Sequence, residues 1–215
     1  MDSSKLVVIT GSTGRLGSVL GAGFVRAGYR VVGLDLNNDL PAAWPLIQAD
    51  VTDEASIEAA FSEVVSQFGS PNAVIHTVGM WGMSSFTETK LADWNLLLKL
   101  NLTSSFLVFK HAIQSMGGKG SLIGIASRQG AVKGASQQAG YSASKGGLVR
   151  LIEAIGAEYE GTDVHIHGIA PSTILFEAEQ TGGVQVAELL EHCLRLANDQ
   201  GKKTNGMILE AFGNG

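Results

Sequence analysis

Short runs of β-branched and other apolar residues alternate along this chain with longer stretches of helical spacing. The runs predicted to be strands are 5–10, 30–35, 45–50, 72–78, 120–127, 163–170 and 206–211. The stretches predicted to be helices are 14–27, 53–68, about 91–116, 138–160 and 184–199. Strands joined by helix-length crossovers pair in parallel, and near-continuous apolar strands suit a sheet buried on both faces. We therefore expect an α/β fold: a doubly wound, mainly parallel seven-stranded sheet with helices on both faces, Rossmann-like.

The length, charge and cysteine content narrow the class of protein. Its 215 residues suit one domain, so we expect 1–215 to form a single domain. The net charge of −5 argues against a nucleic-acid partner or an anionic membrane surface. A single cysteine, Cys193, excludes an internal disulfide and a cysteine-based cluster, and we expect no metal site. No signal peptide and no apolar run of roughly 18 residues is evident, so we expect a cytoplasmic protein.

Glycines spaced three apart follow the first predicted strand, in the sequence VVITGSTGRLG. In a strand–turn–helix context, such glycines let backbone N–H groups approach a pyrophosphate at the helix N-terminus. Tight packing of the helix on the sheet is the alternative reason for them. The turn residues expected to contact a dinucleotide are Gly11, Thr13, Gly14, Arg15, Leu16 and Gly17.

An acidic residue closes the second predicted strand. Asp35 lies close to the offset of about 20 residues at which a carboxylate binds a ribose 2′-hydroxyl, although a solvated acid at a strand end is the alternative. A carboxylate there repels the 2′-phosphate of NADP, so NAD is the preferred cofactor; Arg15 could receive that phosphate, which keeps NADP open. After the third strand, Asp50 is a candidate partner for the adenine amino group and Val51 for the ring, whereas a simple turn before the next helix explains Asp50 equally well.

Tyr141 and Lys145 stand four apart in AGYSASKGGLVRL and share one face of a predicted helix. We expect the lysine ammonium to lower the tyrosine pKa from about 10, so that the phenol exchanges a proton with an alcohol or carbonyl. Ser127 closes the fifth predicted strand and can hydrogen bond the same substrate oxygen. Small residues after Tyr141, including glycines 146 and 147, leave room for a cofactor ribose and a neighbouring element.

Taken in order, these motifs resemble the short-chain dehydrogenase/reductase family from Lys5 to about Gly213. The resemblance rests on TGSTGRLG, Asp35, ADVTD, LKLNLTSSF, IASRQG, YSASK and HGIAPSTI. It implies a catalytic centre of Ser127, Tyr141 and Lys145 assisted by Asn101. It also implies further cofactor contacts by Gly79, Tyr141, Lys145, Pro171, Thr173 and Ile174. Family members form dimers or tetramers through the two long helices near 91–116 and 138–160, so a homodimer or homotetramer is expected.

Several positions depart from the family pattern. His76 stands in an apolar strand where the family has asparagine, and we interpret it as a hydrogen-bonded structural histidine. Ser172 replaces a usual glycine, and Phe176 stands where a threonine is common. The segment 177–183 is short for the family's lid, which predicts a more open site or one completed by another subunit. The short lid also resembles dihydropteridine reductase, a compact family member.

The resemblance implies an NAD(H)-dependent oxidoreductase that interconverts a secondary alcohol and a carbonyl, with Tyr141 as general acid and base and a small alcohol or carbonyl as substrate. Three alternatives remain: a dihydropteridine reductase-like NADH-dependent reductase, a non-catalytic nucleotide-sensing regulator, and an isomerase or epimerase that works by transient oxidation.

Overall fold

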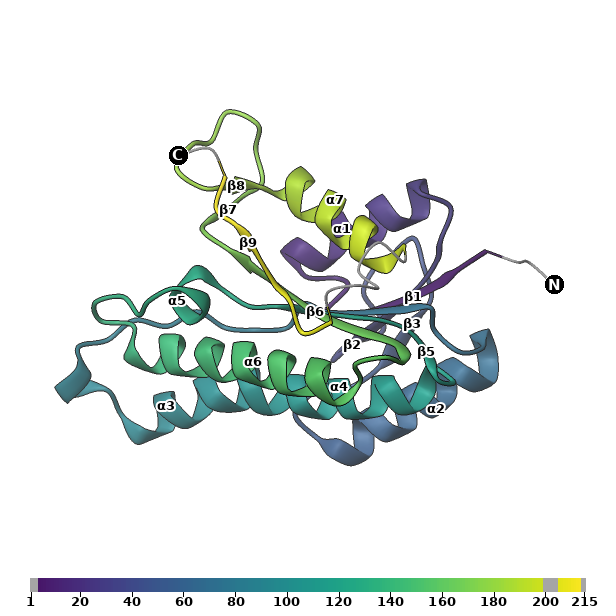
Figure 1. The fold of residues 1–215 in the computed structure, drawn as a ribbon, viewed down its shortest axis with the longest axis horizontal. Helices are drawn as coiled ribbons and strands as arrows, with labels where there is room; N and C mark the ends of the chain where they lie inside the picture. Colours follow the sequence, from purple (N-terminus) through teal and green to yellow (C-terminus); the bar gives the residue numbers. More distant parts are fainter. Residues whose placement is uncertain (1–3, 199–204, 214–215) are drawn as a thin grey trace.

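The computed structural model describes residues 4–198 and 205–213, and within them a seven-stranded sheet forms the centre (Figure 1). The strand order is β3-β2-β1-β4-β5-β6-β9, and every neighbouring pair is parallel. The strands are β1 (Leu6–Thr10), β2 (Arg30–Asp35), β3 (Leu46–Gln48), β4 (Ala73–His76), β5 (Lys119–Ile125), β6 (Asp163–Pro171) and β9 (Ile208–Ala211). This confirms the predicted sheet.

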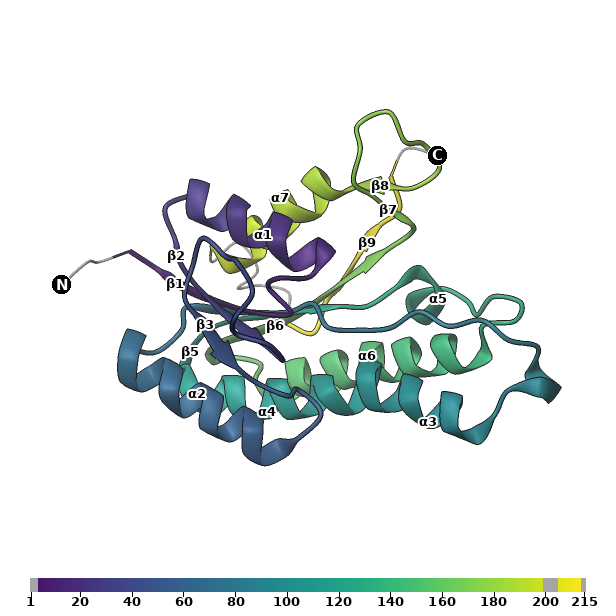
Figure 2. The same cartoon turned by 180° about the vertical axis from the view of Figure 1, so that it is seen from behind.

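Helices cover both faces of the sheet (Figures 1 and 2). One layer holds α1 (Arg15–Arg26) and α7 (Val186–Ala197); the other holds α2 (Glu54–Phe68), α4 (Ser104–Ser115) and α6 (Ala139–Glu158). Side chains alternate along each strand, so Val7 and Ile9 of β1 enter the core under α1 and α7, while Leu6 and Val8 enter the opposite core. Because β2 and β4 flank β1, the strand order reverses there, and a ligand crevice is expected beside the end of β1.

The helix predicted over 91–116 is interrupted. It consists of α3 (Leu91–Leu98), a five-residue π-helical segment (Lys99–Thr103) and α4, and the interruption contains Asn101. Single π turns inside α-helices are frequent at functional sites because they redirect a side chain. A uniform apolar pattern cannot reveal this change of hydrogen-bond register.

The stretch Leu91–Ser115 is also long and apolar enough to cross a membrane by length and composition alone, contrary to the sequence expectation. In the fold, half of its most apolar window is buried, and Val108, Phe109 and Ala112 belong to the core beneath the sheet. A helix that forms part of a protein core passes the same test.

The structure contains several short elements that the apolar pattern did not predict. Two-residue strands β7 (Ile174–Leu175) and β8 (Val184–Gln185) pair in parallel and flank the segment predicted as a short lid. A single helical turn, α5 (Arg128–Ala131), follows β5, and a 3₁₀ turn (Phe86–Glu88) precedes α3. Helix α7 begins at Val186 rather than at 184, and the predicted end of that helix at 199 lies outside the described residues.

Gly146 and Gly147, two adjacent glycines of α6, meet different surroundings. A Cβ at Gly147 would lie 2.8 Å from Cδ2 of Leu102 in the π-helical segment, so the side chain of Leu102 occupies the space that the glycine leaves. A Cβ at Gly146 would come no closer than 3.7 Å to the Gly130 carbonyl oxygen, which is ordinary contact. Gly147 is therefore required by the close approach of Leu102. At Gly146 no neighbour requires a glycine, so its only effect is the low helix propensity of glycine.

These surroundings predict opposite effects of two adjacent substitutions. Gly146→Ala should raise the free energy of unfolding by up to about 1 kcal/mol, because alanine favours the helix and fits the space. Gly147→Ala should lower it by about 1–2 kcal/mol, because Leu102 must move. Urea denaturation of the two variants measures both values; equal effects would contradict this account of α6.

Candidate active site

A cleft of about 600 Å³ opens at the carboxyl ends of the strands, as expected for this topology. Its walls come from the loops after β1, β4, β5 and β6 and from the start of α6. Its lining residues are Leu16, Thr77, Gly79, Met80, Trp81, Ile125, Ala126, Ser127, Gln129, Gln138, Tyr141, Lys145, Pro171, Ser172, Thr173 and Ile174. Eight of these are sequence-predicted site residues: Leu16, Gly79, Ser127, Tyr141, Lys145, Pro171, Thr173 and Ile174.

The glycine turn leads from β1 into α1 at one end of this cleft. Gly11 has φ +67°, a left-handed conformation that favours glycine, and a Cβ at Gly17 would overlap the Gly11 carbonyl oxygen. The first i→i−4 hydrogen bond of the helix runs from the Ser18 N–H to the Gly14 carbonyl at 2.9 Å. The amides of residues 15–17 therefore precede the helical ladder, an arrangement that suits an anion at a helix end.

Asp35 lies directly beside this turn and is 6% exposed. One carboxylate oxygen accepts from the Ser12 N–H at 3.1 Å and the Ser12 hydroxyl at 2.6 Å. The other accepts from the Thr13 N–H at 3.1 Å and the Thr13 hydroxyl at 2.7 Å. Asp35 thus lies beside the predicted nucleotide site. Its carboxylate is buried and accepts hydrogen bonds from the turn, so it is not a solvated acid.

Three other predicted cofactor residues have partners of their own. The Arg15 guanidinium carbon lies 4.0 Å from the Phe176 ring centroid, and Nη2 lies 3.7 Å from the Glu177 carboxylate. Asp50 accepts from both the Thr52 N–H and the Thr52 hydroxyl, which lowers the pKa of its carboxyl, so it has the geometry of a turn residue. Val51 is 7% exposed and belongs to the hydrophobic core.

Ser127, Tyr141 and Lys145 converge at the centre of the cleft. Ser127 and Tyr141 both line the cleft, and the Ser127 hydroxyl donates to Gln129 Oε1 at 2.5 Å. The Lys145 ammonium donates to the Ile125 carbonyl at 2.7 Å, and the side chain is buried. That contact ties α6 to the end of β5, and Tyr141 lies one helical turn before Lys145 on the same face.

Burial changes the pKa of both titratable groups. It raises the pKa of the Tyr141 phenol above its usual 10.0, while the hydrogen bond with Ser127 acts in the opposite direction. The prediction that the Tyr141 pKa lies below its usual value is therefore wrong, because desolvation of the phenolate dominates. Burial lowers the pKa of Lys145 from 10.5 to about 8.

Asn101, in the π-helical segment, anchors the loop that follows β4. Its Oδ1 accepts from the Met80 N–H at 2.7 Å, and its Nδ2 donates to the Met80 carbonyl at 2.8 Å and to the Ser144 hydroxyl at 3.0 Å. A Cβ at Gly79 would lie 3.0 Å from Asn101 Oδ1 and 3.2 Å from Lys145 Nζ, so only glycine fits easily between them. The amide therefore fixes one wall of the cleft.

His76 has partners at both ring nitrogens. Nδ1 lies 2.7 Å from the Thr10 hydroxyl and Nε2 lies 3.2 Å from the Ser104 hydroxyl. Burial lowers the pKa of His76 from 6.5 to about 3, so the ring is neutral at physiological pH. It is a hydrogen-bonded structural histidine, as interpreted from the sequence.

Gln138 and Ser12 are polar residues of the site that were not predicted from the sequence. Gln138 lines the cleft and is the residue before α6, three positions ahead of Tyr141. Ser12, which bonds Asp35, lies inside the glycine motif that drew attention to its neighbours. The nearness of Gln138 to Tyr141 and the place of Ser12 within the glycine motif are the signals in the sequence that could have identified them.

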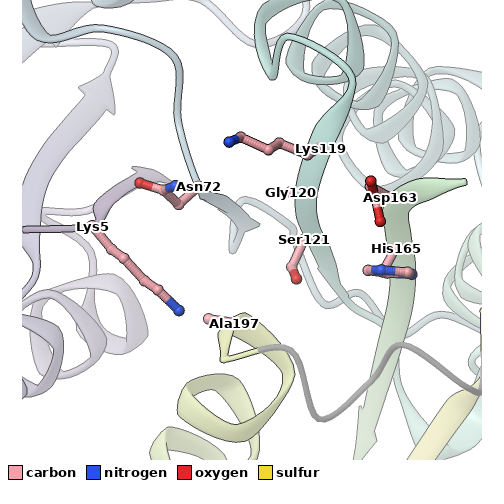
Figure 3. Close-up of a pocket in the computed structure, with 8 residues that line it drawn as sticks. All are labelled: Lys5, Asn72, Lys119, Gly120, Ser121, Asp163, His165 and Ala197. Atoms are coloured by element: carbon pink, nitrogen blue, oxygen red, sulfur yellow. The ribbon is translucent and has the colours of Figure 1, made fainter.

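Another cavity, of about 270 Å³, lies at the opposite end of the strands, where β1, β4, β5 and β6 begin (Figure 3). Its labelled residues include Lys5, Lys119, Asp163 and His165. It contains none of the residues predicted to be catalytic or to bind a cofactor. The candidate active site is therefore the cleft at the carboxyl ends.

Comparison with known proteins agrees with this geometry. Residues 5–183 match the family model described as short chain dehydrogenase. The chain belongs to this family. The fold and family predicted from the sequence are thereby confirmed, and the protein is an oxidoreductase of the short-chain dehydrogenase family.

Several relatives are alcohol or sugar dehydrogenases by name. D-threitol dehydrogenase from Mycolicibacterium smegmatis is 28% identical over 186 residues, which cover 80% of this chain and 71% of the relative. L-fucose dehydrogenase from Rattus norvegicus is 30% identical over 181 residues, which cover 80% and 67%. The structure of sorbitol-6-phosphate 2-dehydrogenase from Erwinia amylovora is similar with a TM-score of 0.88 and 25% identity, covering 97% of this chain and 98% of that one. The family relationship supports action on CH–OH groups.

The lowered pKa of Lys145 predicts a pH-dependent contribution to stability. Between its folded value of about 8 and its usual 10.5, the unfolded chain binds more protons, so stability rises with pH there. The free energy of unfolding of the wild type minus that of Lys145→Met should grow by about 2 kcal/mol from pH 8 to pH 10, at about 1.4 kcal/mol per pKa unit. Urea titrations at several pH values measure the slope; a difference that stays constant or shrinks would show that the ammonium is not desolvated.

Proposed function

We propose that this protein is an NAD(H)-dependent oxidoreductase that interconverts a secondary alcohol and a carbonyl, with Tyr141 as general acid and base. The observation that carries the proposal is the single cleft lined by Ser127, Tyr141 and Lys145, which reaches the start of α1 at Leu16. A proton-transfer group, an oxygen-binding hydroxyl and a dinucleotide turn are thereby adjacent. This combination suits hydride transfer coupled to proton transfer at one substrate oxygen.

The glycine turn and the loop after β6 fit a dinucleotide. Side chains are absent at Gly11 and Gly17 where a Cβ would meet backbone or neighbouring atoms, and the amides of residues 15–17 would hold the pyrophosphate. Pro171, Thr173 and Ile174 line the other end of the cleft and would hold the nicotinamide end. A nicotinamide bound there would supply or accept the hydride.

A preference for NAD over NADP follows from charge near the turn. Asp35 lies at the end of β2, and the exposed connection from residue 36 to residue 43 contains no lysine or arginine to receive a 2′-phosphate. Arg15 is the nearest candidate in the motif, and its guanidinium faces Phe176 and Glu177. Both features favour a ribose with free hydroxyls.

The raised pKa of Tyr141 suits proton donation to a carbonyl oxygen. A protonated phenol is the form needed when a carbonyl is reduced, and Ser127 would stabilise the same oxygen by hydrogen bonding. In the oxidation direction the phenol must lose its proton, which a positive charge on Lys145 would assist. Oxidation should therefore require higher pH than reduction.

The substrate class follows from the lining of the cleft. Gln129, Gln138 and Ser172 supply polar groups around Ser127 and Tyr141, and named relatives act on threitol and fucose. We propose a small hydroxyl-bearing alcohol or its carbonyl form. A panel of polyols, sugars and simple secondary alcohols, each tested with NAD and NADP, would identify it by the absorbance of the reduced nucleotide.

Self-association through the α3–α4 and α6 region is also proposed. Leu96 of α3 and Phe106 of α4 are 44% and 47% exposed, which is unusual for large apolar side chains on neighbouring helices. Family members pair through these helices. Sedimentation of the wild type and of Phe106→Glu would show a dimer or tetramer that the charge weakens.

Replacing the phenol tests the catalytic assignment. Tyr141→Phe should lower kcat by at least 10²–10⁴-fold, because it removes the proton donor and leaves the rest of the cleft in place. Affinity for NADH should change by less than about threefold, as measured by fluorescence titration. Turnover near the wild-type rate would refute the role given to Tyr141.

Cofactor preference tests the role of Asp35. Asp35→Ala should raise the ratio of NADP to NAD efficiency by about tenfold or more, because the negative charge beside the ribose is lost. The ratio of kcat/KM values is the measurement, since any general loosening of the turn affects both cofactors. An unchanged ratio would mean that Asp35 does not set the preference.

A further inference from the structure

Trp44 lies at the end of the exposed connection between β2 and β3, and its indole reaches the glycine turn. Residues 36–43 are mostly exposed, whereas Trp44 is half-buried. Its Nε1–H donates to the Ser12 hydroxyl oxygen at 3.0 Å. A residue outside the nucleotide motif is thus bonded to the centre of that motif.

Two glycines make room for this contact. A Cβ at Gly21 of α1 would overlap the Trp44 ring, so the indole lies against the helix backbone. A Cβ at Gly33 of β2 would overlap the Ser12 hydroxyl oxygen. Any larger residue at either position would push Trp44 or Ser12 away, so the contact depends on both glycines.

The hydrogen bonds run in one direction. An indole N–H can only donate, and a serine hydroxyl carries one proton, so Ser12 accepts from Trp44 and donates to Asp35 at 2.6 Å. With the two N–H groups and the Thr13 hydroxyl, the Asp35 carboxylate then has four donors for its roughly four acceptor positions. Linked hydrogen bonds strengthen one another where water is excluded, and Ser12 is 0% exposed.

We propose that Trp44 is a positioning residue that fixes the nucleotide turn through Ser12 and Asp35 before any nucleotide binds. With residues 12 and 13 bonded to Asp35, the amides left to receive a pyrophosphate are those at the start of α1. A turn ordered in advance has less conformational entropy to lose on binding, which increases affinity without a direct contact. The effect on affinity rests on the proposed nucleotide binding; the ordering of the turn does not.

Hydrogen exchange of the nucleotide-free protein tests the ordering. Trp44→Phe keeps the aromatic ring and removes the donor, and the amides of Ser12 and Thr13 should exchange at least tenfold faster in it. Tyr29→Phe is the matched control, because it removes one aromatic donor, to Asn198 Oδ1 at 2.7 Å, away from the turn. It should leave the exchange of those two amides unchanged.

Titration with NADH tests the consequence. Trp44→Phe should raise the Kd and the KM for NADH about five- to tenfold, with kcat at saturating NADH within twofold of wild type. Ser12→Ala should do the same, and the double variant should be no weaker than Ser12→Ala alone, because both changes break one chain of bonds. If Trp44→Phe does not fold, Ser12→Ala supplies the same exchange and binding comparisons.

The outcomes separate the two proposals. Faster exchange at residues 12 and 13 in a protein that does not bind NADH would support the role of Trp44 and overturn the proposed function. Wild-type exchange in Trp44→Phe, additive losses in the double variant, or a fall in kcat with KM unchanged would each overturn the positioning role.

Discussion

The buried contact between the Lys145 ammonium and the Ile125 carbonyl organises the rest of the site. At 2.7 Å it joins the second turn of α6, the helix that carries Tyr141, to the end of β5, which leads into Ser127. The same nitrogen lies close to Gly79, so the loop after β4 is fixed against it as well. A desolvated ammonium is costly, which its lowered pKa reflects. This ammonium lies where α6, the end of β5 and the loop after β4 meet.

The glycine turn between β1 and α1, at the other end of the cleft, is also held by buried hydrogen bonds. Its glycines permit close backbone approach. The backbone N–H groups of Ser12 and Thr13 donate to Asp35, whereas those at the start of α1 have no partner within the helix. The proposed nucleotide site and the proposed acid–base group therefore both lie at the carboxyl ends of the strands. The membership of the chain in the short-chain dehydrogenase family is consistent with both parts.

The sequence predicted the elements better than it predicted their electrostatics. Alternating apolar runs located the seven strands, and motif spacing brought Ser127, Tyr141 and Lys145 to one cleft, because the ends of parallel strands share an edge. The direction of the Tyr141 pKa shift and the engagement of Asp35 depend on burial and on contacts between distant segments. The π-helical segment at Asn101 likewise reflects local hydrogen-bond register, which residue pattern does not encode.

The central claim is that the Tyr141 hydroxyl exchanges a proton with a substrate whose reacting carbon faces a nicotinamide ring. A crystal structure with NAD and a substrate alcohol tests it most directly. The account predicts the ring in the cleft near Ile174, with the alcohol oxygen within hydrogen-bonding distance of both Tyr141 and Ser127. A ring bound away from that hydroxyl, or a cleft that takes up no nucleotide at saturating concentration, would contradict it.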